Sequence, residues 1–324
     1  MQDVAAPDFT AEVTELLAVI EDRLMVAATA DSPFVTEASQ HIISAGGKRF
    51  RPLLVALSSR FGDDVDTDAL IKAALVVELT HVASLYHDDV MDDADLRRGA
   101  PSANRRWTNS IAIMVGDFLF ARASSTVAEL GVDFVALQAK TFARLVQGQI
   151  AETRGPQPGD DPLAHYLQVV ADKTGSLIAA SALFGGMVAD APRETLDALA
   201  AFGEEIGVVF QLSDDLIDIT SERTGKTPGT DLREGVPTLP TLMLKASGDP
   251  ADDDLKALIS GDLSSDEALA TALAALRAHP VMAQARAEVE RRADIARGYL
   301  RDLPEGPAKD ALLQVCTDIV DRAS

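Results

Sequence analysis

The chain has 324 residues, of which 47% are hydrophobic and 25% charged, and its formal net charge is −22. This length permits a large hydrophobic core, and the acidity argues against nucleic-acid binding because the phosphates would repel the protein. Cys316 is the only cysteine, which excludes an internal disulfide and a cysteine-based metal site and is compatible with a reducing cytoplasm.

The chain has no visible domain boundary. No composition shift, internal repeat or low-complexity tract divides it, so we expect one domain over residues 1–324. Residues 1–10 lack the order of a signal peptide, in which basic residues precede an apolar stretch. The chain also has no uninterrupted run of 18 or more apolar residues, so no membrane span is predicted. These features predict a soluble, cytoplasmic protein.

Helical periodicity dominates the sequence. Aromatic residues make up only 5% of the chain, and Ala and Leu recur every three or four residues. The predicted fold class is therefore all-α, with helices at about 11–30, 34–45, 51–61, 66–92, 108–130, 132–152, 161–189, 193–219, 238–247, 265–278, 281–302 and 307–322. Residues 153–162 and 221–237 contain several Gly and Pro and are predicted loops; the second is either a lid beside a site or an ordinary connection.

The first chemically informative segment is Gly46-Gly47-Lys48-Arg49-Phe50-Arg51-Pro52, just before a predicted helix. Backbone N–H groups at a helix start attract anions, and Lys48 and Arg51 add positive charge. We interpret the segment as an anion site, and an exposed surface loop is the alternative.

The helix predicted at 66–92 ends in an aspartate motif, Asp88-Asp89-Val90-Met91-Asp92. Carboxylates at i and i+4 share one face of a helix, about 6 Å apart. His81 lies two turns earlier on the same face, where it either contacts substrate or is a core histidine. His87, beside Asp88, is interpreted as a supporting residue. Arg97 and Arg98 follow closely, either as anion ligands or as a helix-end pair that neutralises nearby aspartates.

The same motif recurs as Asp214-Asp215-Leu216-Ile217-Asp218, at the end of the helix predicted at 193–219. Carboxylate oxygens without a His or Cys cluster suit hard cations, so Mg²⁺ is predicted, with Mn²⁺ as an alternative. Because Mg²⁺ shares its coordination with phosphate oxygens, the motifs indicate a phosphorylated substrate. Lys173, Thr174 and Lys226 add further polar and cationic groups on later segments.

Taken in order, these segments resemble those of the trans-isoprenyl (all-E polyprenyl) diphosphate synthases over nearly the whole chain. The resemblance also includes the segments Gly116-Asp117-Phe118-Leu119, Phe210-Gln211-Leu212-Ser213, Gly225-Lys226 and Gly229-Thr230-Asp231. It implies an all-α, single-domain bundle of long helices around a deep central cavity, the isoprenoid synthase type. The two aspartate motifs are expected to face each other at the cavity mouth, usually in a homodimer.

The resemblance also implies roles for individual residues. About three Mg²⁺ ions are expected, bound by Asp88, Asp92 and Asp214, with Asp89, Asp215 and Asp218 in support. The substrates are an allylic prenyl diphosphate, held by Arg97, Lys173 and Lys226, and isopentenyl diphosphate, held by Lys48, Arg51, His81 and Arg98. Thr174 and Gln211 are expected near the developing carbocation. Val236 stands where the family often has a second lysine, which puts a second cation over the allylic diphosphate in doubt.

Product length is expected to depend on the positions just before Asp88. In the family, bulky aromatics four and five residues earlier give short products, whereas this chain has Ser84 and Ala83. We therefore predict a long-chain all-trans product, hexaprenyl to decaprenyl, unless a deeper residue such as Met114 or Phe142 closes the cavity.

Four alternatives remain open: a shorter-chain geranylgeranyl or farnesyl diphosphate synthase, a noncatalytic subunit of a heteromeric synthase, a class I terpene cyclase and an acidic helical scaffold. Lys48, Arg51 and Arg98 argue against the cyclase, which has no use for a second diphosphate site.

Overall fold

A computed structural model describes residues 9–220 and 228–322 of the chain. Helices form nearly all of its regular structure, which confirms the predicted all-α class. The exception in the described ranges is a two-stranded antiparallel hairpin, β1 (Leu96–Arg97) and β2 (Ala100–Pro101). The described residues group into two compact units, and the prediction of one domain stays a prediction.

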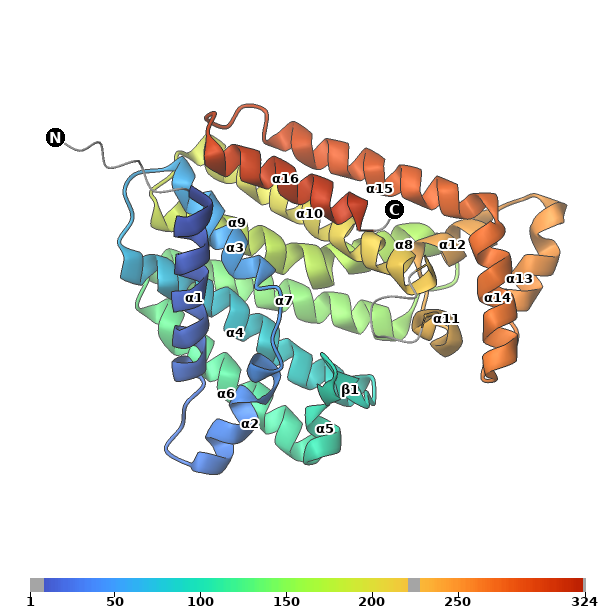
Figure 1. Ribbon diagram of the computed structural model, residues 1–324, viewed down its shortest axis with the longest axis horizontal. Coiled ribbons are helices and arrows are strands. Elements are labelled where there is room, and N and C mark those ends of the chain that lie inside the picture. Colours follow the sequence, from blue (N-terminus) through green and yellow to red (C-terminus); the bar gives the residue numbers. More distant parts are fainter. Residues whose placement is uncertain (1–8, 221–227, 323–324) are drawn as a thin grey trace. The chain divides into compact units, whose positions relative to one another are not determined.

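The first unit consists of the described parts of Met1–Ala143, Leu177–Ala200 and Asp302–Leu312. Besides the hairpin, its elements are α1 (Phe9–Ala27), α2 (Pro33–Ser44), α3 (Phe50–Ser58), a short 3₁₀ turn (Ser59–Phe61), α4 (Thr67–Met91), α5 (Ala103–Arg106) and α6 (Asn109–Ala128). Helix α4 packs against α1, α3 and α6, so it is the central helix of this unit (Figure 1).

Helix α4 is long because its sequence caps it and buries most of its faces. The carboxylate of Asp66 accepts hydrogen bonds from the N–H groups of Asp68 and Ala69 at the helix start. Its apolar residues from Leu70 to Ala83 are buried, and so is Tyr86. By length and hydropathy α4 and α6 could each cross a membrane, although neither contains an uninterrupted run of 18 apolar residues. In α4, 78% of the most apolar 18-residue stretch is buried, which is typical of a core helix. In α6 the corresponding share is 33%.

The second unit consists of the described parts of Arg144–Ser176, Ala201–Arg301 and Leu313–Ser324. Its elements are α8 (Pro162–Val170), a π-helical turn (Ala171–Gly175), α11 (Thr230–Glu234), α12 (Leu239–Ala246), a 3₁₀ turn (Pro250–Asp252), α13 (Asp253–Ile259), α14 (Asp266–Ala278) and α15 (Pro280–Tyr299). Helix α12 packs against α8, α13 and α15, and α14 packs against α13 and α15.

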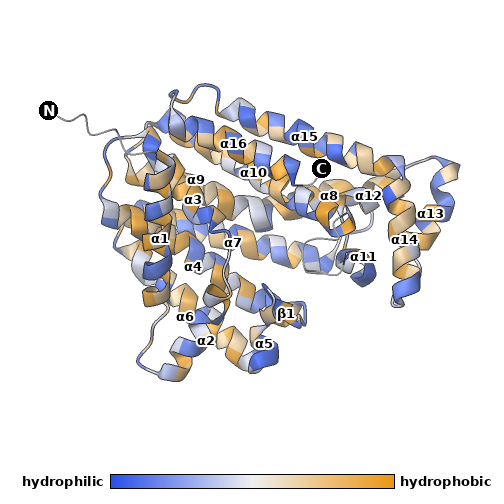
Figure 2. Cartoon of the chain, viewed as in Figure 1, coloured by the Kyte–Doolittle hydropathy of each residue, from blue (hydrophilic) through white to orange (hydrophobic). Residues whose placement is uncertain are grey.

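Four helices begin in one unit and end in the other: α7 (Val132–Arg154), α9 (Ser176–Val188), α10 (Arg193–Thr220) and α16 (Pro307–Asp321). Hydrophilic and hydrophobic residues alternate along the outer helices, as along α1 and α15 in Figure 2. On α1, for example, Val13, Ile20 and Leu24 are buried. This is the pattern of helices with one face on a core.

The structure differs from the predicted elements in several places. The predicted helix at 161–189 is helical without a break over residues 162–188, but a π-helical turn divides it into α8 and α9. Residues 96–101 form the hairpin, which has Arg98 and Gly99 at positive φ in its turn. The predicted loop 221–237 contains α11, and α13 was not predicted. All of these are short features whose local sequence has no strong periodicity.

Candidate active site

The first aspartate motif occupies the last turn of α4. Asp88 is half-buried, Asp89 is buried, and Asp92 is the exposed residue that caps the helix. The N–H of Asp92 donates to the carbonyl of Asp88 at 2.8 Å, so the turn stays helical through the motif. Asp93 then takes a left-handed φ of 48° and ends the helix.

Asp89 connects the end of α4 to the hairpin and to α5. Its Oδ1 accepts a hydrogen bond from Arg97 Nε at 2.6 Å, and its Oδ2 lies 3.5 Å from the N–H of Ala103. Arg97 therefore neutralises a nearby aspartate, which was one of its two predicted roles. It does so from a β-strand and not from a helix end. Its role at an allylic diphosphate stays a prediction.

A cluster of cations lies around the Gly46–Arg51 segment in the first unit. Arg98 donates to the carbonyls of Ile42, at 3.1 Å, and Gly46, which brings the hairpin to this segment. Arg51 is half-buried, its Nε has no hydrogen-bond partner, and burial, with a smaller contribution from Arg98, lowers its pKa to about 10. Lys48 is exposed.

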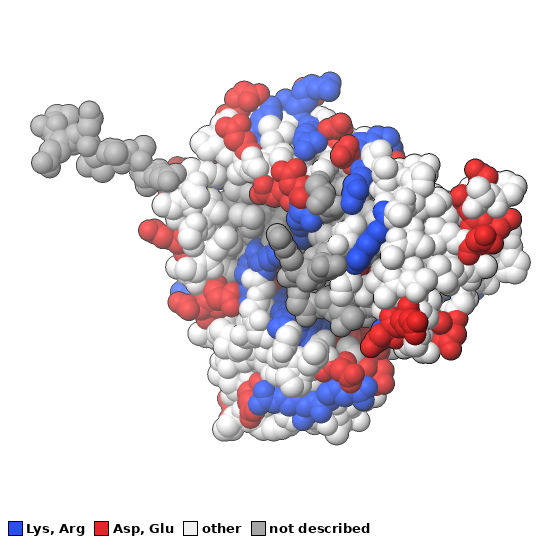
Figure 3. Space-filling view, turned by 45° about the vertical axis from the view of Figure 1, so that its right-hand side comes forward, with Lys and Arg blue, Asp and Glu red and all other residues white. Residues whose placement is uncertain are grey.

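His81 belongs to the same cluster. Burial lowers its pKa well below the usual value, and Arg51, Arg98, Arg97 and Arg49 lower it further by electrostatic repulsion. The side chain is therefore neutral at pH 7, and it can donate one hydrogen bond and accept another. On the face drawn in Figure 3 basic side chains gather in several places, some of them beside acidic side chains, so the net charge of −22 does not prevent local positive regions.

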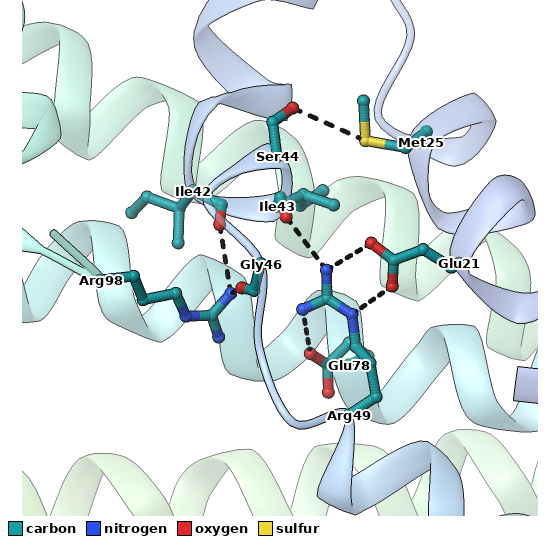
Figure 4. A network of polar contacts seen from close by, with 9 residues as sticks. All are labelled: Glu21, Met25, Ile42, Ile43, Ser44, Gly46, Arg49, Glu78 and Arg98. Carbon is teal, nitrogen blue, oxygen red and sulfur yellow. Dashed lines mark hydrogen bonds and ion pairs between the residues drawn. The ribbon is translucent and has the colours of Figure 1, made fainter. Parts of the chain in front are cut away.

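Sequence reasoning missed two residues in this region, Arg49 and Glu78. Arg49 is 8% exposed and Glu78 2% exposed, and they form an ion pair with Glu21 as a third member (Figure 4). A signal was present in the sequence. Glu78 is an acid within an apolar run that extends from Ala73 to Leu79, and a buried acid requires a partner.

The second motif occupies the last two turns of α10. Asp214 Oδ1 accepts from Arg322 Nη2 at 2.8 Å. Asp218 accepts the N–H groups of Gly229, through its carbonyl at 2.8 Å, and of Asp231, through its carboxylate at 3.3 Å. The motif thus fixes the start of α11.

Asp215 is buried and connects α10 to two other helices, α8 and α12. Its Oδ2 accepts from the Tyr166 hydroxyl on α8 and, at 2.8 Å, from the Leu239 N–H at the start of α12. Gln211 Nε2 lies 3.5 Å from the other oxygen. Burial raises the pKa of Asp215 to about 7, although these three donors act in the opposite direction.

Lys173 and Thr174 lie in the π-helical turn between α8 and α9, and both are half-buried. Such turns are frequent at functional sites because they alter the direction of side chains locally. Lys173 Nζ pairs with Glu152 Oε2 on α7 at 2.5 Å. A Cβ on Gly148 would lie 2.7 Å from the Lys173 backbone nitrogen, so α7 approaches this turn at a glycine. Lys226 lies outside the described residues.

The two product-length positions differ in burial. Ala83 has no exposed surface, whereas Ser84 retains 9% and donates from Oγ to the His81 carbonyl at 2.8 Å. Of the deeper alternatives, Met114 is 56% exposed, and Phe142 contacts Phe120 with ring centroids 4.2 Å apart. Ser84 is therefore the better position at which to test control of product length.

The donor set fits Mg²⁺ only in part. In the described ranges, no three His, Cys, Asp or Glu side chains come together as a complete metal site. Asp88, Asp92 and Asp214 nevertheless offer carboxylate oxygens that are not fully buried, 44% exposed in the case of Asp214. An incomplete set of oxygen donors suits an ion that retains waters and completes its coordination with phosphate.

The comparison with family models identifies the chain. Residues 32–276 match the model of the polyprenyl synthetases. The chain belongs to this family. It is thus a polyprenyl diphosphate synthase, a prenyltransferase of a metal-dependent family, and the predicted enzyme class is confirmed.

Relatives with different products resemble this polyprenyl synthetase about equally. It is 43% identical over 322 residues to nonaprenyl diphosphate synthase of Mycobacterium tuberculosis, covering 99% of this chain and 96% of that one. A dimethylallyltranstransferase of the same organism is 37% identical, covering 94% of each chain. The structure of geranylgeranyl pyrophosphate synthase from Corynebacterium glutamicum, complexed with calcium and isoprenyl diphosphate, has a TM-score of 0.88 and 43% identity and covers 99% of each chain.

Proposed function

We propose that this synthase condenses an allylic prenyl diphosphate repeatedly with isopentenyl diphosphate and makes a long-chain all-trans product, in the hexaprenyl to decaprenyl range. The observation that carries the proposal is a separation of charge within the first unit. Arg51, Arg98 and the neutral His81 gather at the Gly46–Arg51 segment, whereas Arg97 pairs with Asp89 of the metal motif. A second anion site suits a reaction with two diphosphate substrates.

Asp88, Asp92 and Asp214 are the proposed Mg²⁺ ligands, with Asp89, Asp215 and Asp218 holding the ends of α4 and α10 in place. Bound Mg²⁺ supplies electrostatic stabilisation of the leaving diphosphate. Arg97, Lys173 and Lys226 hold the allylic diphosphate, and Lys48, Arg51, His81 and Arg98 hold that of isopentenyl diphosphate. Because Val236 stands where the family often has a second lysine, Lys226 is the single lysine proposed for the segment 221–237.

The chain's own residues then stabilise charge where it develops. Cations held around the allylic diphosphate favour its departure, because they stabilise the negative charge that develops on the leaving group. Thr174 and Gln211 lie near the cation that remains, and their oxygens stabilise it. The double bond of isopentenyl diphosphate attacks this cation, and the departed diphosphate accepts the proton that is lost.

Incubation of the purified chain with Mg²⁺, labelled isopentenyl diphosphate and farnesyl or geranylgeranyl diphosphate tests the proposal. We expect a ladder of products that ends at one length between hexaprenyl and decaprenyl, measured by mass spectrometry. Products that end at geranylgeranyl diphosphate would contradict the long-chain assignment. Complete inactivity with every primer would instead support a noncatalytic subunit, and a cyclised product without consumption of isopentenyl diphosphate would support a cyclase.

The small side chains of Ala83 and Ser84 support a long product. A phenylalanine at position 84 should shorten it by one or more isoprene units, because the ring fills space that the growing chain requires. Ala83→Phe should act in the same direction but also destabilise the fold, since Ala83 is fully packed. An unchanged product distribution for Ser84→Phe would contradict control at this position.

We further propose a homodimer. Helix α6 is strongly apolar, yet Ile113 is 43% exposed and Met114 56% exposed on it. A second copy of the chain is the proposed partner of this face. Light scattering should give twice the monomer mass of 34.3 kDa, and Met114→Glu should lower it. A monomeric wild-type chain would contradict the dimer without affecting the proposed reaction.

A further inference from the structure

Arg49 lies at the start of α3 and differs from the other cations of the Gly46–Arg51 segment. It is 8% exposed, whereas Lys48 is exposed and Arg51 half-buried. Its φ of 46° lies in the left-handed region, which non-glycine residues seldom occupy without compensating contacts. The surroundings of Arg49 must therefore hold it in this conformation.

Those contacts come from three helices (Figure 4). On α1, the Glu21 carboxylate accepts two hydrogen bonds from the guanidinium, from Nε and, at 2.6 Å, from Nη2. On α4, Glu78 Oε1 lies 3.1 Å from Nη1, and at the end of α2 the Ile43 carbonyl lies 3.0 Å from Nη2. Arg49, the N-cap residue of α3, thus ties the start of this helix to α1, α2 and α4.

The ion pairs divide the cations into two groups. Glu21 and Glu78 neutralise Arg49, so this guanidinium has little charge or hydrogen-bonding capacity left for an anion. Arg98, by contrast, donates to the uncharged carbonyls of Ile42 and Gly46, and the Nε of Arg51 has no partner. In the described ranges Arg51 and Arg98 form no ion pair with a carboxylate, although Glu78 acts on both through space, whereas Arg49 pairs directly with Glu21 and Glu78.

Gly47 shows how closely the chain is held between these groups. A Cβ at this position would lie 2.7 Å from Arg49 Nη1 and 2.9 Å from Arg98 Nη1. The backbone therefore passes between two guanidinium groups, each fixed by its own hydrogen bonds. Displacement of Arg49 would release one side of the segment that carries Lys48 and Arg51.

We propose that Arg49, with Glu21 and Glu78, positions the Gly46–Arg51 segment for the diphosphate of isopentenyl diphosphate without touching that ligand. The inference rests on the proposed function of the segment. Like-charged side chains separate in the absence of an anion, and binding must then include the cost of bringing them together. The buried ion pairs hold the segment in its binding geometry beforehand. Arg49, Glu21 and Glu78 are thus positioning residues.

Glu21→Gln is the sharpest test, because Glu21 is 39% exposed and the substitution keeps its shape. We expect the KM for isopentenyl diphosphate to rise about tenfold, with kcat and the KM for the allylic substrate changed less than about twofold. Arg49→Lys should show the same selective increase, because Lys retains the charge but cannot form the forked contacts. Glu12→Gln is the matched control on α1, since Glu12 pairs with the exposed Arg60 at 3.3 Å.

Calorimetric titration with inorganic pyrophosphate provides a readout that does not depend on turnover. Both variants should bind it about tenfold more weakly than the wild type and the Glu12→Gln control. An unchanged KM for isopentenyl diphosphate in a folded Glu21→Gln variant would overturn the positioning role. A lower kcat with both KM values unchanged would also overturn it, because it indicates a general loss of folded enzyme. A wild-type chain that consumes no isopentenyl diphosphate contradicts the proposed function itself.

Discussion

The two aspartate motifs have the same sequence pattern, but the second of their three aspartates has different hydrogen-bond partners in each. Asp89 and Asp215 are both buried, with 0% and 3% exposure. Asp89 has a cationic partner, Arg97, whereas Asp215 accepts hydrogen bonds from a hydroxyl, a backbone N–H and an amide. Burial then raises the pKa of Asp215 to about 7. An identical local pattern therefore leads to two electrostatic environments, because the partners lie outside the motifs: Arg97 eight residues after Asp89, and Tyr166 and Leu239 49 and 24 residues from Asp215.

The outer aspartates differ as well. Asp88 and Asp92 stand at the end of α4 beside an arginine-rich hairpin, while Asp214 has an ion pair with Arg322 at the end of α16. A cation already bound to Asp214 must move or share that carboxylate when a metal ion binds. The two motifs are thus expected to differ in metal affinity although their sequences match.

The largest expected effect is loss of catalysis when a direct metal ligand is removed from either motif. Asp88→Asn and Asp214→Asn should each lower kcat about 10³-fold, because the leaving diphosphate loses electrostatic stabilisation. Steady-state kinetics at saturating Mg²⁺ measures the effect. Asp93→Asn is the control, since Asp93 is exposed, pairs with Arg105 and has a left-handed φ that Asn also tolerates. Activity above about a tenth of the wild type in either ligand variant would exclude that aspartate as an essential ligand.

The next effect separates the two middle aspartates. Asp89→Asn should lower the free energy of unfolding by about 3 kcal/mol, because it leaves the Arg97 charge without its partner beside a buried group. Asp215→Asn should cost only about 1 kcal/mol, because an amide oxygen can still accept from the neutral donors. Urea unfolding of both variants provides the comparison. Equal losses would show that the ion pair and the neutral hydrogen bonds stabilise their motifs alike.

A smaller effect concerns His81, in the cationic region beside the first motif. Its folded pKa lies well below the unfolded value, so between these two values the unfolded chain binds a proton that the folded chain does not. The free energy of unfolding therefore decreases as pH falls below about 6.5, by up to about 1.4 kcal/mol per pH unit from this group. Urea unfolding at pH 7.5 and 5.5 should show a smaller decrease for His81→Gln than for the wild type. The same decrease in both would assign the pH dependence to other groups.

The smallest effect concerns the ion pair of Asp214. Arg322→Gln removes a cation that competes with a metal ion, so the Mg²⁺ concentration for half-maximal activity should fall about threefold. A titration of activity with Mg²⁺ measures it, and Arg301→Gln, on the connection before α16, serves as the control. A higher Mg²⁺ requirement would mean that Arg322 holds Asp214 in its binding geometry instead of competing for it.

Sequence reasoning predicted the helix ends that carry the chemistry better than the contacts made there. Asp88 to Asp92 lie at the end of α4, and Asp214 to Asp218 at the end of α10, both within a residue or two of the predicted helix ends. Long apolar periodicity defines such helices reliably, since burial favours one register strongly. The π-helical turn at Lys173 and the hairpin at Arg97 were missed, because neither has a periodic pattern of its own.

The partners of the site residues were the least predictable part. Glu21 and Glu78 are 28 and 29 positions from Arg49 in sequence, and Tyr166 is 49 positions from Asp215. Spacing along a helix constrains only neighbours within about one turn. For this reason the sequence assigned Arg97 to an anion or to an aspartate without deciding between them, and it gave Arg49 no role.

The sequence alone determined the all-α class, the two acidic helix ends and the family, because these depend on local periodicity and on ordered motifs. Tertiary structure decided which charges neutralise one another. It bound Arg49 to Glu21 and Glu78, left the Nε of Arg51 without a partner, and gave one buried aspartate a cation and the other neutral donors. The physical reason is that ionic contacts and burial depend on distances in space, which residues far apart in the chain acquire only when the helices pack.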